Sequence, residues 1–198
     1  MFFSESLSPV SQAVCAELSE QLRNVSMDDF SVSDANVSFF VAGYIGRSIS
    51  RRRRCSACKE LLVLNDEENV APPDFVGNSN TLFHLANRGG LCIPSEFCFA
   101  LTSFAVQNYN FLSFDVTLKE KLLTTCNPRQ VFIYALKSIA SSSDIYTSLV
   151  SKTCASGHFC FDNVLASAFN CFAKNELKRM NTEKENEVTA RKIRKLTQ

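Results

Sequence analysis

Two short cysteine-containing turns, far apart in the chain, constrain its fold more than any other feature. Cys55 and Cys58 form a Cys-x2-Cys pair, Cys154 and His158 form a Cys-x3-His pair, and 95 residues lie between Cys58 and Cys154. A tetrahedral zinc site commonly takes two ligands from such a tight turn, because the short gap lets both side chains face one ion. We therefore predict a single structural Zn²⁺ site made of Cys55, Cys58, Cys154 and His158.

The long separation between the two pairs is compatible with one site. Loop-closure entropy costs only about 0.6 kcal/mol per doubling of loop length, and structural zinc contributes on the order of 10 kcal/mol in small peptides. The ion is therefore expected to join two parts of an already folded domain. Cys92 and Cys160 are the reserve ligands if Cys154 is not one.

The other cysteines and the second histidine are expected to be structural. The chain has 9 cysteines, and without a recognisable secretion signal these should be mostly reduced thiols. His84 is predicted to be a hydrogen-bonded core histidine. Four cysteines have apolar neighbours and are predicted to be small core residues: Cys15, Cys98, Cys126 and Cys171.

Apolar residues at helical spacing, without strand–helix alternation, predict an all-α fold. Gly43 and Gly46 interrupt one such stripe and indicate either close backbone packing or a turn. We divide the chain into an acidic N-terminal segment with a short helix (1–36), a helical zinc-stapled domain (37–174) and a charged, basic tail (175–198). Helices are expected at Pro9–Leu22, from Val37, from Ser95 to about Val106, at Leu118–Thr125, from Pro128 to the serine run 141–143, from Asp144, and along the stripe Phe161–Phe172.

Positive charge is concentrated in two segments, although the formal net charge is only +1. Residues 47–59 hold six bases and no acid, and residues 174–198 hold eight bases against four acids. These segments could meet on one face and contact DNA phosphates. The candidate nucleic-acid-binding residues are Arg47, Arg51, Arg52, Arg53, Arg54, Lys59, Lys178, Arg179, Arg191, Lys192, Arg194 and Lys195.

The arginine run Arg51–Arg54 directly precedes Cys55 and could serve the metal site. Three thiolates and one neutral imidazole around Zn²⁺ leave one net negative charge, which nearby arginines would offset. The run could equally be a solvated stretch or a nuclear-import signal. We expect a nuclear or nucleo-cytoplasmic protein, since neither a secretory signal nor an apolar segment of membrane-spanning length is recognisable.

Catalysis and a KH fold are weaker interpretations of the same residues. A thiol–imidazole pair at His158 lacks a recognisable orienting group, and the carboxylate-bearing strands of a nuclease are not recognisable, so we expect no enzyme and no small-molecule substrate. The segment Gly43-x-x-Gly46 fits the backbone clamp of a KH domain, which remains an alternative. That fold also requires a three-stranded sheet around the clamp.

Three segments in this order resemble the C-terminal region of P-element-like, THAP-type DNA transposases, the part that follows the RNase H-like core. They are Val41-Ala-Gly-Tyr-Ile45 running into Cys55-x2-Cys58; Asn87-Arg-Gly-Gly-Leu91 with Pro94-Ser95; and Cys154-x3-His158 leading to Asn170-x4-Asn175 and Arg191-Lys-Ile-Arg-Lys-Leu196. The resemblance covers most of residues 37–198 and supports the four predicted metal ligands. It implies a parent with a THAP DNA-binding domain and a DDE catalytic core, neither of which is recognisable here.

These observations predict a non-catalytic, zinc-binding module derived from a transposable element. Its expected partners are DNA, through phosphate contacts, and other transposase segments or a second copy of itself. The competing hypothesis is a protein–protein interaction scaffold that uses the Phe-rich helices and has no nucleic-acid role.

Overall fold

A computed structural model describes residues 7–23, 32–52, 55–64, 91–142, 144–158 and 160–196. Every regular element in these ranges is a helix, which confirms the predicted all-α class. None of the described helices combines the length and the apolar character needed to cross a membrane. The helices are α1 (Pro9–Leu22), α2 (Val32–Arg52), α3 (Ser56–Leu62), α5 (Glu96–Phe114), α6 (Val116–Thr124), α7 (Pro128–Ser141), α8 (Asp144–Ser151) and α9 (Phe161–Leu196).

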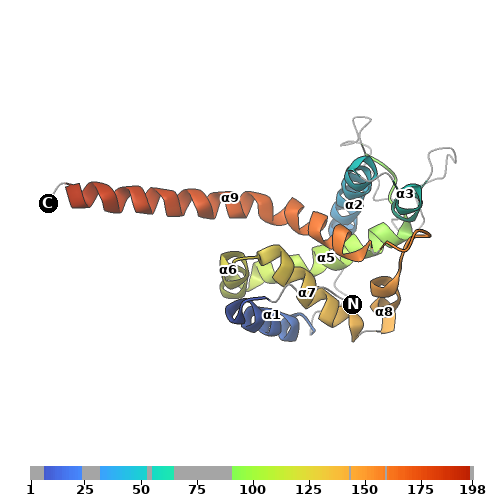
Figure 1. The fold of residues 1–198 in the computed structure, drawn as a ribbon, viewed down its shortest axis with the longest axis horizontal. Helices are drawn as coiled ribbons and strands as arrows, with labels where there is room; N and C mark the ends of the chain where they lie inside the picture. The colour runs from blue at the N-terminus through green and yellow to red at the C-terminus, as the bar shows by residue number, and fades with distance from the viewer. Residues whose placement is uncertain are drawn as a thin grey trace.

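Helix α5 runs through the centre of the body and packs against α2, α3, α6 and α9 (Figure 1). Helices α1 and α8 pack on α7, which in turn contacts α9. One continuous cluster of buried apolar side chains includes residues from all of these helices, among them Leu18 of α1 and Leu101 of α5. The helix of the acidic N-terminal segment therefore shares its core with the rest of the body.

Side-chain caps explain where three helices begin. Ser8 Oγ accepts a hydrogen bond from the Ser11 amide at 3.3 Å, Ser95 Oγ from the Cys98 amide at 3.1 Å, and Asp115 Oδ1 from the Leu118 amide at 2.9 Å. Each bond satisfies an amide that has no partner inside the helix. Ser95, where the sequence predicted the start of a helix, caps α5, whereas Asn127 precedes α7 without a side-chain capping bond.

Helices α5 and α2 extend beyond the ranges that their sequence patterns predicted. Helix α5 continues past Val106 to Phe114, because Tyr109 and Leu112 still pack into the core. Helix α2 begins at Val32, before the predicted start at Val37. Cys98 is buried and Cys15 half-buried as expected, but Cys126 and Cys171 are exposed, so the core prediction was wrong for these two residues. The prediction for His84 lies outside the described residues.

Gly46 allows α2 to approach the end of α3 closely. A Cβ atom at this position would lie 3.0 Å from Val63 Cγ2 and 3.5 Å from the Leu62 carbonyl oxygen. The prediction of close packing is confirmed, and the segment 43–46 lies inside a continuous helix. The KH alternative is therefore wrong, because the clamp of that fold is a loop and no strand is found in the part of the chain that the structure describes.

The final helix, α9, has two different halves. In its first half Phe161, Val164, Leu165, Ala168 and Phe169 are buried, as the predicted stripe required. Phe169 lies 5.2 Å from Phe132 of α7 between ring centroids. The second half extends away from the body, and the C-terminal end of α9 lies at the opposite end of the long axis from α3 (Figure 1).

Candidate metal centre

The first pair of candidate ligands stands at the start of α3. Cys55 has extended backbone angles (φ −79°, ψ 111°) immediately before the helix, and Cys58 lies in its first turn. The short helix is fixed at its other end, where the Ser95 amide donates to the Leu62 carbonyl at 3.0 Å and the Leu64 amide to the Ile93 carbonyl at 3.0 Å. The segment entering α5 therefore holds the cysteine turn in place.

The second pair lies in a tight turn that leads into α9. The Gly157 amide donates to the Cys154 carbonyl at 2.8 Å, and the Cys154 amide donates to the His158 carbonyl at 3.1 Å. Gly157 has φ +74°, a left-handed conformation that glycine adopts without the steric cost paid by other residues. The turn thus depends on the glycine between the two candidate ligands.

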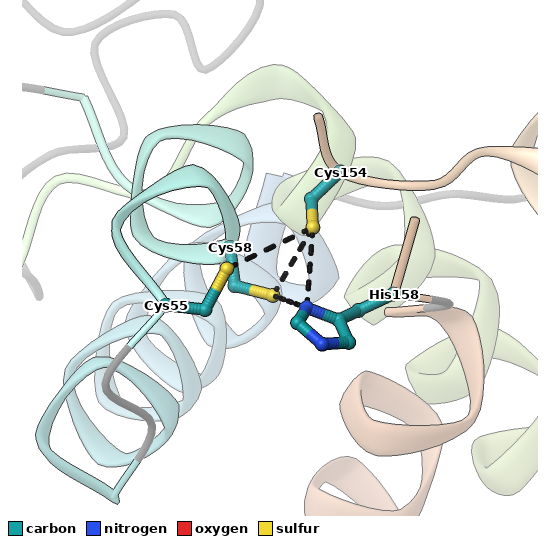
Figure 2. Close-up of side chains that lie close together, drawn as sticks. All are labelled: Cys55, Cys58, Cys154 and His158. Carbon is teal, nitrogen blue, oxygen red and sulfur yellow. Dashed lines mark hydrogen bonds between the residues drawn. The ribbon is translucent and has the colours of Figure 1, made fainter. Parts of the chain in front are cut away.

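The fold brings the two pairs together, with the four side chains pointing toward one another (Figure 2). Cys154 Sγ lies 3.9 Å from Cys55 Sγ and 3.5 Å from Cys58 Sγ. His158 Nδ1 lies 3.6 Å from Cys58 Sγ and 3.5 Å from Cys154 Sγ. All four ligand atoms fall within 4.8 Å of one another, so the juxtaposition predicted from the spacing is found.

These separations match the edges of a tetrahedral coordination shell. With Zn–S bonds of about 2.3 Å and a Zn–N bond of about 2.05 Å, tetrahedral angles give S···S edges of about 3.8 Å and S···N edges of about 3.6 Å. The four distances above fall close to these values. Cys55, Cys58, Cys154 and His158 could therefore hold one metal ion.

The site is buried on one side and open on the other. Cys58 and Cys154 are buried, with 1% and 4% of their surface exposed, Cys55 is half-buried, and the imidazole of His158 is exposed. An ion can therefore enter beside His158, while the two buried sulfurs lie against the apolar core.

In the metal-free chain the four groups have different proton affinities. The pKa of Cys55 is lowered to about 6, chiefly by its hydrogen bond with the Ser156 hydroxyl and then by the Cys58 amide. Burial raises the pKa of Cys58, and contacts with the neighbouring thiols raise it further. Hydrogen bonds to Cys55 and Cys154 raise the pKa of His158. A metal ion must displace the protons that these groups hold.

The arginine run has no described part in this electrostatic environment. Arg51 and Arg52 are exposed at the end of α2, and Arg53 and Arg54 lie outside the described residues. The causes that lower the pKa of Cys55 are hydrogen bonds within the site. The idea that the arginines favour the thiolates therefore stays a prediction.

The candidate nucleic-acid-binding residues whose side chains the structure describes lie on three helices. Lys59 is exposed on α3 and Arg47 is half-buried on α2, whereas Lys178 is exposed on α9. The expectation that the basic middle and the basic tail meet was wrong, because the far end of α9 points away from α3 (Figure 1). For Arg179, Arg191, Lys192, Arg194 and Lys195 the structure describes only their place along α9.

Cys160 lies beside the metal centre, a position that its spacing in the sequence did not predict. Cys160, considered above only as a reserve ligand, is buried, and its Sγ lies 3.7 Å from Cys58 Sγ. The other reserve ligand, Cys92, is half-buried, and its amide donates to the Gly43 carbonyl at 3.5 Å. A Cys-x5-Cys spacing between Cys154 and Cys160 was the available signal for proximity, but it does not distinguish a ligand from its neighbour.

The fold and the four-residue cluster define a class of protein: an all-helical domain whose distant segments converge on a Cys3His group with metal-ligand geometry. Comparison with known families makes this more specific, because residues 18–182 match the family described as "DNA transposase THAP9, C-terminal domain". The chain belongs to this family, and the matched region contains all four cluster residues. No curated protein and no solved structure matches the chain.

Proposed function

We propose that Cys55, Cys58, Cys154 and His158 bind one structural Zn²⁺. The observation that carries this proposal is the agreement between the 3.5–3.9 Å separations and the edges of a zinc tetrahedron. Three thiolates and an imidazole are soft and borderline donors, which favour zinc over magnesium or calcium. Four protein ligands complete the shell, as in structural rather than catalytic zinc sites.

The ion would join the beginning of α3 to the segment that enters α9. Helix α3 is attached to the body mainly through α2 and α5, and the 154–158 turn lies between α8 and α9. Zinc would therefore fix two short connections that contribute few apolar side chains of their own. Because the core is already extensive, the metal is expected to tighten one region instead of directing folding of the whole chain.

The wider function is that of a non-catalytic C-terminal module in a transposable-element-derived, nuclear protein. Membership of the transposase family supports this function, and so do the exposed bases at the junction of α2 and α3. Arg51, Arg52 and Lys59 would contact DNA phosphates there, with the basic end of α9 forming a second, separate contact. Such contacts position nucleic acid without reading its sequence.

A mobility-shift titration against salt tests the DNA contact. Replacement of Arg51 and Arg52 by alanine should weaken binding and reduce the slope of log K against log [salt] by about 1 for each phosphate that is no longer neutralised. The control variant carries Lys121→Ala and Arg129→Ala, which make the same charge change at exposed positions on α6 and α7. It should leave the slope unchanged.

The same titration distinguishes DNA binding from the second candidate function, that of a protein-interaction module. Absence of binding at low salt would contradict the DNA contact and leave an interaction module for other transposase segments or a second copy. Two strongly exposed apolar side chains, Phe114 (89% exposed) and Val116 (61% exposed), at the α5–α6 corner favour that alternative. Equal weakening by both double variants would show that binding depends only on total charge.

A further inference from the structure

Cys160 occupies a position between the metal centre and α9. It is 2% exposed and directly precedes α9. Its carbonyl accepts a hydrogen bond from the Val164 amide at 3.1 Å, so this residue forms part of the first turn of the helix. Its thiol has two acceptors within reach, Cys58 Sγ at 3.7 Å and the His158 carbonyl oxygen at 3.8 Å. One residue therefore connects a buried candidate ligand to the longest helix of the fold.

Each sulfur of the centre receives a hydrogen bond from a donor outside the four ligand atoms. Cys55 Sγ lies 3.5 Å from the Ser156 hydroxyl and also accepts from the Cys58 amide. Cys154 Sγ accepts from the amides of His158 and Ser156. For Cys58 the corresponding donor is the Cys160 thiol. In the metal-free chain contact with Cys160 raises the pKa of Cys58, so this hydrogen bond reaches a thiolate only after the metal has displaced the Cys58 proton.

The donor to Cys58 should matter more than the donors to Cys55. Cys55 is half-exposed, so water can replace a lost hydrogen bond there. Cys58 is 1% exposed and packs against core side chains. A buried anionic sulfur without a donor is strongly destabilised, because neither water nor a mobile side chain can reach it.

We propose that Cys160 is a positioning residue of the metal centre, which donates its S–H to the metal-bound Cys58 thiolate and couples that thiolate to the first turn of α9. This inference rests on the proposed zinc site. It predicts that Cys160 remains a thiol, outside the coordination shell, while the metal is bound. Loss of this donor weakens metal binding without removing a ligand, as second-shell partners of other metal sites do.

Four variants of the full chain separate this role from a general effect on packing. Cys160→Val removes the donor and keeps an apolar side chain of slightly larger volume, with Cys160→Ala as a second donor-free variant if valine overpacks the site. Cys160→Ser keeps a donor. Val164→Ala disturbs the same buried helix one turn later and leaves the donor in place. Circular dichroism first establishes that each variant is folded.

Two measurements are then made on every variant: zinc affinity by competition with a chromogenic chelator, and the sulfur-to-metal charge-transfer band of the Co²⁺-substituted protein. The donor-free variants should bind zinc about 10- to 100-fold more weakly. Their charge-transfer band should move to longer wavelength at unchanged intensity, because a thiolate without a hydrogen bond is a stronger electron donor. Cys160→Ser should restore both properties, and Val164→Ala should keep the band of the original chain.

The outcomes distinguish this inference from the zinc proposal itself. If the original chain binds neither zinc nor Co²⁺, the zinc proposal fails and this inference fails with it. If the original chain binds zinc and the donor-free variants keep its affinity and band position, only the role of Cys160 is wrong. A loss of charge-transfer intensity in these variants would identify Cys160 as a fourth thiolate ligand and would overturn the positioning role.

Discussion

Glu176 holds α9 to the body, and its replacement should destabilise the domain substantially. One carboxylate oxygen accepts from Tyr109 OH at 2.9 Å, and the other lies 2.7 Å from Lys119 Nζ. The ammonium group of Lys119 also lies 5.3 Å from the centroid of the Tyr109 ring. These three residues come from α9, α5 and α6, so a single carboxylate joins three helices.

The expected cost follows from the burial of this cluster. Tyr109 is 5% exposed, so Glu176→Ala leaves a buried hydroxyl without its charged acceptor, at about 1.5–3 kcal/mol. The side chains of the ion pair are 17% and 31% exposed, so solvent screening limits its loss to about 0.5–1 kcal/mol. We therefore expect a total of about 3 kcal/mol, which for a domain of this size lowers Tm by about 6–12 °C.

Urea unfolding of the metal-loaded protein measures this cost, and a double-mutant cycle with Tyr109→Phe isolates the hydrogen bond. Glu176→Gln keeps an acceptor for the tyrosine and should lose only about 1 kcal/mol. The control Glu120→Ala removes an exposed carboxylate on α6 and should change stability by less than about 0.5 kcal/mol. If Glu176→Ala behaves like this control, or if the cycle gives no coupling, the reasoning is wrong.

Three further predictions concern the metal-binding turns and their packing. In the metal-free protein, the rate of Cys55 alkylation should show a midpoint near pH 6, because the folded-state pKa of this thiol lies below the ordinary value of 9.0. Buried Cys98, with a pKa of about 12, should stay unreactive. A midpoint near pH 9 for Cys55 would contradict this prediction. The same shift means that ionisation of Cys55 adds stability as pH rises from about 6 to 9, and that this contribution is lost on acidification. Gly157→Ala should cost about 1–2 kcal/mol of backbone strain and weaken zinc binding about tenfold in chelator competition; unchanged affinity would show that the turn tolerates the substitution. Gly46→Ala gains about 1 kcal/mol of helix propensity but forces a contact with buried Val63. Urea unfolding should therefore report a net loss of about 1 kcal/mol in the free energy of unfolding. A net gain in stability would contradict the close packing.

Local signals in the sequence were sufficient to predict the helices and the convergence of the two ligand pairs. Ser95 before an apolar run predicted a capped helix, and the Cys-x2-Cys and Cys-x3-His spacings predicted tight turns with side chains on one side. The same helical periodicity that predicted the stripe from Phe161 could also have shown that Cys171 points away from it. The exposure of Cys171 was therefore within reach of the sequence.

Contacts between distant segments were not accessible in this way. Tyr109 and Glu176 are separated by 67 positions, and nothing near either residue indicates the other. Spacing likewise gave Cys160 as a possible ligand but could not show that it lies beside Cys58, since that depends on how α3 and α9 pack. The direction of the second half of α9, which separates the two basic segments, is also set by tertiary contacts, such as the one at Glu176.

Native mass spectrometry of the reduced protein, before and after chelation, tests the zinc site most directly. One Zn²⁺ per chain should be present, should leave on chelation, and should be lost or greatly reduced in Cys154→Ser. The matched variant Cys126→Ser changes an exposed cysteine outside the cluster and should keep the ion. A chain that carries no metal as purified and takes up none when zinc is added, or a Cys154→Ser variant that retains zinc in full, would contradict the account.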